Sequence, residues 1–239
     1  GNIWFSDFNP ISGMEQNSFL FQQAARVGMS HGEILRHVVA SACRRHGLTL
    51  PAEPVPATSQ KNIRVLFGGA TAERQVSLMS GTNVWLKLRK SGEYNPDPCF
   101  LDSEGKVWPL PYMFCLFHTV EEIAQSCQNA SEIISRLATM TPSIRKRLGL
   151  IADFAPQAPQ PQSLDQFIAD SKSRDAFVFL GLHGGIGEDG TLQTMLDKAG
   201  LPYNGSGADA SRLCMDKQET GKAITAANIP QVMTAPKTS

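Results

Sequence analysis

Two glycine-rich stretches place polar side chains directly after runs of apolar residues. Residues 63–67 lead into GGATAERQVS, where Glu73 and Arg74 follow a glycine pair. Residues 176–182 lead into HGGIGEDG, where His183 precedes four glycines. Because strand ends of an α/β sheet present side chains to a cleft, the acid and the histidine are candidates for binding a small polar substrate. Taken alone, each stretch is also consistent with a tight turn and a helix that starts with acidic residues.

The second stretch contains a G-x-G-x-x-G pattern, formed by Gly185, Gly187 and Gly190. This pattern is the outline of a dinucleotide-binding loop, so a nicotinamide-dependent oxidoreductase with a Rossmann-type loop is one alternative. Glu188 and Asp189 lie where a pyrophosphate would approach the helix start, and their charges would repel it. The pattern also follows a late strand instead of the first. A non-catalytic scaffold is a further alternative.

Two other segments carry ligand chemistry. Asp7 and Asn9 alternate on an extended segment and therefore point to one face. Carboxylate and amide oxygens suit Mg²⁺, although a turn at Asn9-Pro10 explains the same residues. Lys217, in MDKQETGK, can reach a phosphate or can be an ordinary solvated lysine. No serine–histidine–acid triad or pair of catalytic carboxylates can be recognised from the sequence order.

The composition narrows the class of protein. The 239 residues are 41% hydrophobic and 18% charged, enough for one or two buried cores. The formal net charge is zero, so the chain lacks the basic excess typical of binding to nucleic acid or to an anionic membrane. No apolar run is long enough to span a bilayer. The five cysteines are scattered without zinc-ligand spacing, which favours reduced, packed thiols.

Several helices are signalled by their caps and spacing. Ser30 and Glu33 form a capping box that predicts a helix to residue 46, ended by Gly47. Residues 118–148 are predicted as two helices, the second starting at Thr141-Pro142. Further helices are expected at residues 72–90, residues 190–199 and from about Asp209.

Short apolar strands alternate with these helices, at residues 63–67, 99–102 and 176–183. This alternation predicts an α/β fold with a parallel sheet. Residues 103–174 fit the alternation poorly, and we interpret them as an insertion. The proline-rich residues 48–61 are typical of a linker. The opening GNIWFSDFNP resembles the middle of a strand and loop, so we expect the chain to be a fragment.

Taken together, the motifs resemble one family, the D-alanine–D-alanine ligases of the ATP-grasp superfamily. VLFGGATAERQVSLMSG resembles that family's opening strand and loop. LHGGIGEDGTLQTMLDKAGLPYNGSGADASRLCMDK is similar to its second signature, and DFNPISGMEQNSFLFQQAARVGMSHGEIL resembles its C-terminal signature. The resemblance covers most of residues 5–46, 62–102 and 175–230.

The C-terminal signature comes first in this chain. That order resembles the junction of a tandem-duplicated ligase of the plant plastid type, with a rearranged single ligase as the alternative. The expected parts are a C-terminal piece of a first repeat (1–47), a linker (48–61), the N-terminal, pre-ATP-grasp domain of a second repeat (62–208) and the truncated start of its ATP-grasp domain (209–239). The tandem interpretation implies the chloroplast stroma, and the alternative implies the cytoplasm.

The resemblance implies an ADP-forming ligation of two D-alanines through an acyl phosphate, for peptidoglycan precursor synthesis. ATP and Mg²⁺, or Mn²⁺, are the implied cofactors, and D-lactate stays open as the second substrate. The implied partners are small molecules, without nucleic acid or membrane, with a homodimer or a pairing of repeats. The chain alone is expected to be inactive because the central ATP-grasp portion is missing on both sides.

Three site residues carried over from the resemblance belong to the second repeat. Glu73 would hold the ammonium group of the first D-alanine. His183 would lie close by and orient that substrate, so both are also candidate catalytic residues. Lys217 would contact a phosphate of ATP.

The remaining site residues belong to the first repeat. Asp7 and Asn9 would hold magnesium, and the Gly13 N–H would stabilise the oxyanion. Ser18 would bind the carboxylate of the second substrate. Asp7 stands where the family usually has the longer Glu, and Ser12 stands where it has Pro. These departures shorten the reach of the acid to a metal and make the loop less rigid.

Overall fold

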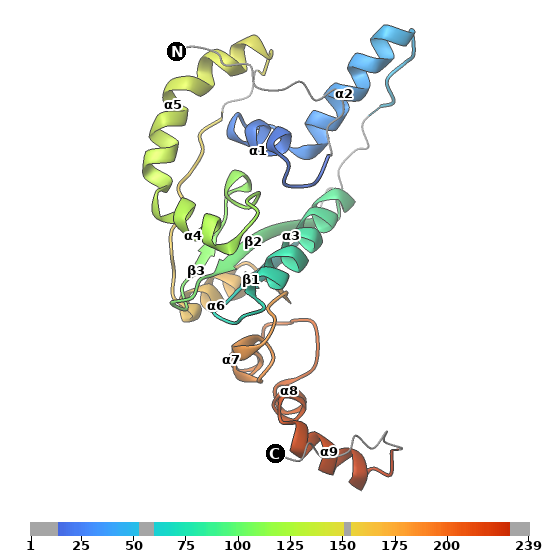
Figure 1. Cartoon of the computed structure of the whole chain (residues 1–239), viewed down its shortest axis with the longest axis vertical. Coiled ribbons are helices and arrows are strands. Elements are labelled where there is room, and N and C mark those ends of the chain that lie inside the picture. The colour runs from blue at the N-terminus through green and yellow to red at the C-terminus, as the bar shows by residue number, and fades with distance from the viewer. Residues whose placement is uncertain (1–13, 53–59, 151–153, 230–239) are drawn as a thin grey trace. The chain divides into compact units, whose positions relative to one another are not determined.

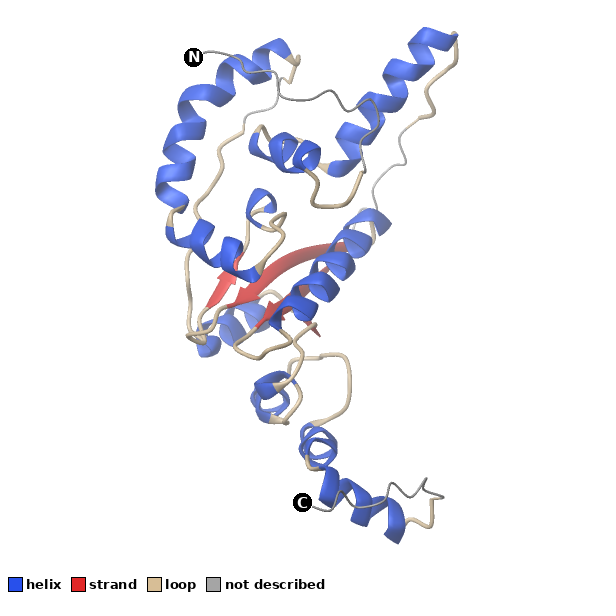
Figure 2. Cartoon of the chain, in the orientation of Figure 1, coloured by secondary structure: helices blue, strands red, loops and turns tan. Residues whose placement is uncertain are grey.

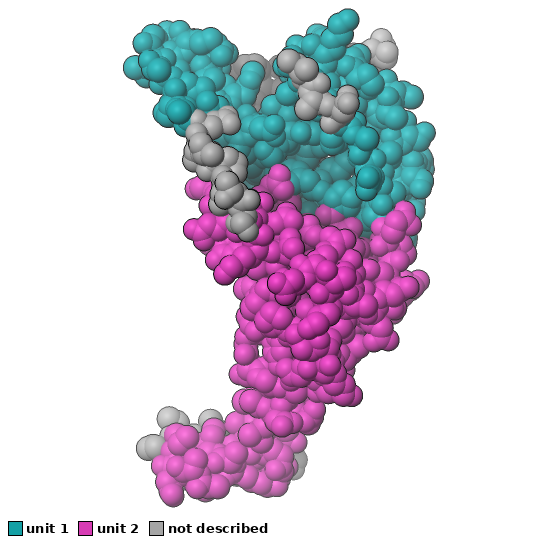
Figure 3. Space-filling model, turned by 180° about the vertical axis from the view of Figure 1, so that it is seen from behind, with its two compact units in different colours: residues 1–55, 111–159 teal, residues 56–110, 160–239 magenta. Residues whose placement is uncertain are grey.

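The computed structural model describes residues 14–52, 60–150 and 154–229 (Figure 1). They belong to two compact units, shown in different colours in Figure 3. Unit 1 takes in residues 1–55 and 111–159, and unit 2 takes in residues 56–110 and 160–239. The domain boundaries expected from the sequence concern the repeat from which each segment derives, and they stay a prediction.

Unit 2 is built on a four-stranded sheet with the strand order β3-β2-β1-β4 (Figure 2). Strand β1 pairs in parallel with both β2 and β4, while β3 is antiparallel to β2. The bounds are β1 (Lys61–Gly68), β2 (Tyr94–Leu101), β3 (Val107–Pro109) and β4 (Phe177–Leu180). The expected α/β class is confirmed. The antiparallel edge strand is an addition to it, made possible by the tight turn at 102–105.

Helices cover both faces of this sheet: α3 (Arg74–Ser91) lies on one face, and α6 (Leu164–Ser173) and α7 (Thr191–Ala199) lie on the other. Two further helices follow, α8 (Ala208–Met215), which packs against α7, and α9 (Lys217–Ala226), which packs against α8. The helix expected at residues 72–90 corresponds to α3, which Gly92 ends in the left-handed conformation. The helix expected from Asp209 is divided at Asp216, whose carboxylate accepts hydrogen bonds from the first backbone N–H groups of α9.

Side chains of β1 alternate between the two helical layers. Phe67 faces α3, where it lies directly against Gly81. Leu66 faces the opposite layer and packs with Phe167 of α6 and Leu192 of α7. Because both faces of β1 are covered, Val65, Leu66 and Phe67 are all fully buried.

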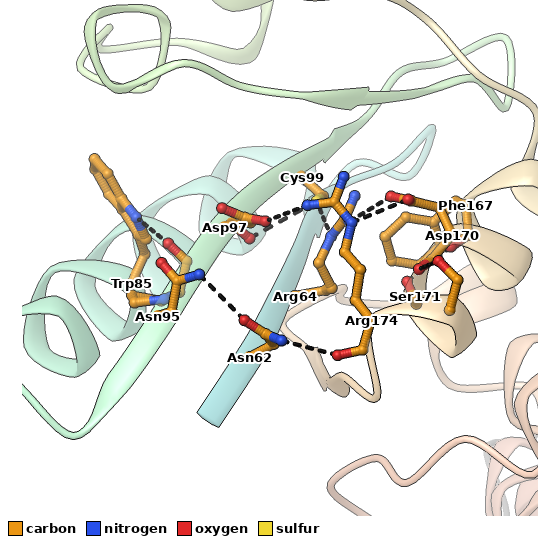
Figure 4. Close-up of polar contacts among 12 residues, drawn as sticks. Asn62, Arg64, Trp85, Asn95, Asp97, Cys99, Phe167, Asp170, Ser171 and Arg174 are labelled. Carbon is orange, nitrogen blue, oxygen red and sulfur yellow. Dashed lines mark hydrogen bonds and ion pairs between the residues drawn. The ribbon is translucent and has the colours of Figure 1, made fainter. Parts of the chain in front are cut away.

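Arg64 interrupts the apolar run of β1, yet it is only 1% exposed (Figure 4). Its Nη1 donates to Asp170 Oδ2 at 2.6 Å, and its Nε donates to Cys99 Sγ at 3.3 Å. The guanidinium lies 5.2 Å from the centre of the Phe167 ring. Burial raises the pKa of the Cys99 thiol to about 11, so the thiol is neutral at physiological pH. The strand therefore buries one charge that Asp170 compensates.

Unit 1 is helical in its described part. Its elements are α1 (Phe19–Arg26), α2 (His31–His46), the short 3₁₀ turn η1 (Tyr112–Phe114), α4 (Val120–Gln128) and α5 (Ala130–Arg147). Contacts join its two sequence segments: the Tyr112 hydroxyl hydrogen-bonds the His31 ring, and Arg145 Nη1 donates to the Val27 carbonyl at 2.5 Å. The segment before the linker therefore packs on residues 111–150.

The helix predictions in unit 1 had two outcomes. The capping box of Ser30 and Glu33 and the left-handed Gly47 at the end of α2 are confirmed. The helix start predicted at Thr141-Pro142 was wrong, because α4 and α5 divide at Asn129 and Pro142 lies inside α5. The helix therefore continues through Pro142, although this residue cannot donate a backbone hydrogen bond.

None of the described helices combines the length and the hydropathy needed to cross a bilayer. None of the five cysteines forms a disulfide in the described structure, and Cys99, Cys115 and Cys127 are buried. These three thiols therefore serve as small core residues, as expected.

Candidate functional site

The loops after β1 and β4 meet at one edge of the sheet. Parallel pairing brings Leu66 of β1 beside Leu180 of β4, so the carboxyl ends of both strands emerge next to each other. From β1 the chain passes through α3 to β2 on one side, and it returns later to β4 on the other side. This is a topological switch point, the position where open α/β sheets place their ligands.

Glu73 and His183 occupy this switch point. Glu73 directly precedes α3 and is exposed, while His183 follows β4 and is half-buried. A Cβ atom placed on Gly184 would lie 3.4 Å from Glu73 Oε2. The structure thus brings the acid against the loop of His183, although the two residues are 110 positions apart in the sequence.

Hydrogen bonds between side chains and backbone join the two loops. The Thr71 hydroxyl donates to the His183 carbonyl at 2.7 Å and accepts from the Glu73 N–H at 3.3 Å. Ser80 Oγ lies 3.2 Å from Nε2 of the His183 ring. Deeper in the sheet, the buried Ser77 hydroxyl donates to the Gly181 carbonyl at 2.7 Å and accepts from the Gly68 N–H at 2.8 Å.

Sequence reasoning did not name these hydroxyl residues. Residues 73, 77 and 80 follow an i, i+4, i+7 pattern, so Ser77 and Ser80 share one face of α3 with Glu73. That spacing is a signal that the sequence contains. Thr71 lies in a loop and gives no periodic signal, because its role depends on a contact with a distant segment.

The glycines of the second loop serve packing. A Cβ atom on Gly187 would lie 2.5 Å from Leu182 Cβ, and one on Gly190 would collide with the Ala208 carbonyl. The loop is also held from within, since the buried Gln193 donates Nε2 to the Gly187 carbonyl at 2.7 Å. Close approach of backbone to other parts of the protein therefore explains two of the three glycines.

Asp189 occupies the start of α7. Its Oδ1 accepts a hydrogen bond from the Thr191 N–H at 2.8 Å. A carboxylate therefore takes the place that a pyrophosphate would need at this helix terminus. The nicotinamide alternative is not favoured.

The other predicted site residues lie elsewhere. Lys217 is the first residue of α9 in unit 2 and is exposed. Ser18 directly precedes α1 in unit 1 and is half-buried. Asp7, Asn9 and Gly13 lie outside the described residues. The structure therefore brings together Glu73 and His183 among the predicted site residues that it describes.

A mostly parallel α/β domain with polar residues at its switch point belongs to the class that binds small ligands at the carboxyl ends of strands. A family model described as "D-ala D-ala ligase N-terminus" matches residues 62–206. The matched range contains all four strands and both loops of the site. It also includes residues 103–174, for which sequence reasoning found no counterpart.

Curated relatives and solved structures carry similar names. The D-alanine–D-alanine ligase of Chlorobaculum tepidum is 33% identical over 160 residues, which cover 66% of this chain and 39% of that protein. The ligase of Synechococcus sp. is 31% identical over 186 residues, covering 77% and 43%. The solved D-alanine–D-alanine ligase of Coxiella burnetii is 23% identical with a TM-score of 0.46, covering 75% of this chain and 46% of that one.

The chain belongs to the D-alanine–D-alanine ligase family. The family match, which takes in more than half of the chain, rests on the N-terminal domain of these ligases. The chain spans about two fifths of the length of the curated relatives that it matches.

Proposed function

We propose that this chain supplies part of the binding site for the first substrate of a D-alanine–D-alanine ligase. The observation that carries the proposal is the pairing of Glu73 with the His183 loop at the switch point, inside the range of the family match. The exposed Glu73 carboxylate can accept the ammonium group of an amino acid. Gly184 presents no side chain to that carboxylate, whereas a Cβ atom there would lie in van der Waals contact with Oε2, at 3.4 Å.

The proposed reaction is the ADP-forming ligation of two D-alanines for peptidoglycan precursors. ATP, when bound, supplies the phosphoryl group that activates the carboxylate of the first D-alanine as an acyl phosphate. Glu73 holds the ammonium group of this D-alanine, and His183 orients it. The amine of the second D-alanine attacks the activated carbonyl, and the peptide bond forms as the bond to phosphate breaks and inorganic phosphate leaves. For the corresponding site of the first repeat, to which residues 1–47 belong, we assign the carboxylate of the second D-alanine to Ser18 and the stabilisation of the oxyanion to the Gly13 N–H.

Among the described residues, Lys217 is the one that we assign to ATP, whereas the residues that we assign to the metal lie outside the described part. Lys217 is exposed and can pair with a phosphate, whereas Asp216 already accepts the Gln218 and Glu219 N–H groups at the same helix start. Within residues 14–52, 60–150 and 154–229, no group of three or more His, Cys, Asp or Glu side chains could hold a metal ion. Asp7 and Asn9 are the ligands that we propose for Mg²⁺ or Mn²⁺.

We also propose that the chain crosses the junction of two ligase repeats. The order of the signatures and the proline-rich residues 48–61 support this proposal. Residues 1–47 then end the first repeat, residues 62–208 form the N-terminal domain of the second, and residues 209–239 begin its ATP-grasp domain. A plant-type tandem would act in the chloroplast stroma, whereas a single rearranged ligase would act in the cytoplasm. The proposed partners are small molecules, with a homodimer or a pairing of the repeats.

Release of ADP that depends on D-alanine tests this function in the complete tandem protein. Glu73→Gln is expected to lower the rate about a hundredfold, because a hydrogen bond between charged groups contributes roughly 3 kcal/mol. Glu104→Gln makes the same change at an exposed acid away from the site and is expected to leave the rate unchanged. The isolated chain is expected to release no ADP. Equal rates for Glu73→Gln and the unaltered protein would contradict the role of Glu73.

A further inference from the structure

One hydroxyl group connects the backbones of both proposed substrate residues. The Thr71 Oγ1 donates to the carbonyl of His183 at 2.7 Å and accepts from the N–H of Glu73 at 3.3 Å. Both partners belong to the backbone, so the hydroxyl fixes the backbone position of each residue and leaves each side chain available to a ligand. Among the hydrogen bonds of the described residues, no other bond joins the backbone of Glu73 or His183 to the opposite loop. The His183 ring also lies 3.2 Å from Ser80 Oγ of α3, but that contact involves the side chain.

The methyl group of Thr71 faces the same loop. A Cβ atom on Gly184 would lie 3.3 Å from Thr71 Cγ2, and one on Gly185 would lie 3.1 Å from it. Both glycines have positive φ angles, 70° and 53°, which side chains rarely adopt. The methyl therefore packs against a backbone path that only small residues allow. Threonine combines this contact with the hydroxyl, whereas serine keeps only the hydroxyl and valine keeps only the methyl.

The surroundings of Thr71 are already fixed by other bonds. The Arg74 N–H donates to the Thr71 carbonyl at 3.2 Å, which ties the threonine to the start of α3. On the far side, Ser77 bridges the ends of β1 and β4 through Gly68 and Gly181. The two strands are thus joined below the loops, and Thr71 joins the loops themselves.

We propose that Thr71 is a positioning residue of the first-substrate site, which sets the placement of Glu73 against His183. This inference rests on the proposed function for its consequence in substrate binding. Its structural part, the ordering of residues 183–185 by the Thr71 hydroxyl, stands without any substrate. Loss of the hydroxyl leaves the His183 carbonyl without its donor, and the loop gains freedom.

The test compares Thr71→Val, which removes the hydroxyl at nearly constant volume, with Thr71→Ser, which keeps it. The first readout is ¹⁵N relaxation of residues 183–185 in the chain without ligand. The second readout is the affinity for D-alanine from a titration. We expect Thr71→Val to lower the order parameters of residues 183–185 from about 0.85 to below about 0.6 and to weaken D-alanine binding about tenfold. Thr71→Ser is expected to restore most of both.

A matched control separates the effect of the Thr71 hydroxyl on the loop from a general loss of stability. Thr225→Val makes the same substitution at a threonine whose hydroxyl bonds within α9, and it is expected to leave both readouts unchanged. Order parameters in Thr71→Val equal to those of the unaltered chain would overturn the inference. So would a mobile loop with unchanged D-alanine affinity. If the unaltered chain binds no D-alanine, the proposed function fails, and the relaxation data still decide whether Thr71 orders the loop.

Discussion

At the scale of single residues, the largest electrostatic feature of unit 2 is the buried Arg64. Its charge is compensated by Asp170 of α6, which Arg174 also contacts at 3.0 Å. Burial acts to raise the pKa of the Asp170 carboxyl, but hydrogen bonds from both arginines outweigh burial and hold this pKa below its usual range. The ionised carboxylate therefore stabilises the folded chain.

Asp170→Asn is expected to lower the free energy of unfolding at pH 7 by about 2 to 3 kcal/mol, because Arg64 is left buried without a charged partner. Since the folded-state pKa is depressed, this contribution is present above the unfolded pKa, near 3.9, and is lost as the pH falls through the folded pKa. Urea unfolding from pH 7 to pH 3 should therefore show the two proteins converging. The control Glu104→Gln breaks an exposed pair and should cost less than about 1 kcal/mol. A constant difference at all pH values would contradict this assignment.

The residue types alone indicated part of the site. Glu73 and His183 could be named because each follows an apolar run and a glycine turn. Thr71 and Asp170 could not be named, since each acts on a residue more than a hundred positions away. Nothing in the local sequence of a polar residue shows which distant strand it will meet.

At the scale of elements, the ends of helices were predicted correctly where capping residues set them and incorrectly where tertiary packing sets them. The capping box and the glycine stop fixed the bounds of α2. The caps do not show which side of α2 is covered, and Leu35, Val38 and Val39 are each more than 40% exposed within the described structure. In α5, tertiary packing carries the helix through Pro142, which local propensity alone would place at a helix start.

The contact of α3 with β1 gives a prediction at this scale. Gly81→Ala improves helix propensity by about 1 kcal/mol, yet the added Cβ would lie 2.5 Å from Phe67 Cβ. Overpacking of this kind costs about 1–3 kcal/mol, so we expect a net loss of stability in urea unfolding. Gly221→Ala, in α9 with no atom within 4 Å of the new Cβ, is expected to stabilise by up to about 1 kcal/mol. Stabilisation by both substitutions would show that α3 can move away from the strand.

At the scale of the whole molecule, residues 62–206 form a family domain, and we propose that the segment before it ends another copy. The sheet, its order and the switch point place Glu73 and His183 in one site of unit 2. The alternation of strands and helices predicted this α/β class, but it could not predict that residues 111–159 group with the N-terminal segment. Grouping of that kind depends on contacts between distant segments, which local patterns do not encode.

The most direct test of the central claim is a titration of the ¹⁵N-labelled chain with D-alanine and, separately, with L-alanine. We predict that D-alanine shifts the amide signals of Glu73, Gly184 and Gly185 at lower concentration than L-alanine does. Glu73→Gln should remove most of this response, because the ammonium group loses its charged partner. Signals that stay unchanged with D-alanine, or that shift equally in Glu73→Gln, would contradict a first-substrate site at this edge of the sheet.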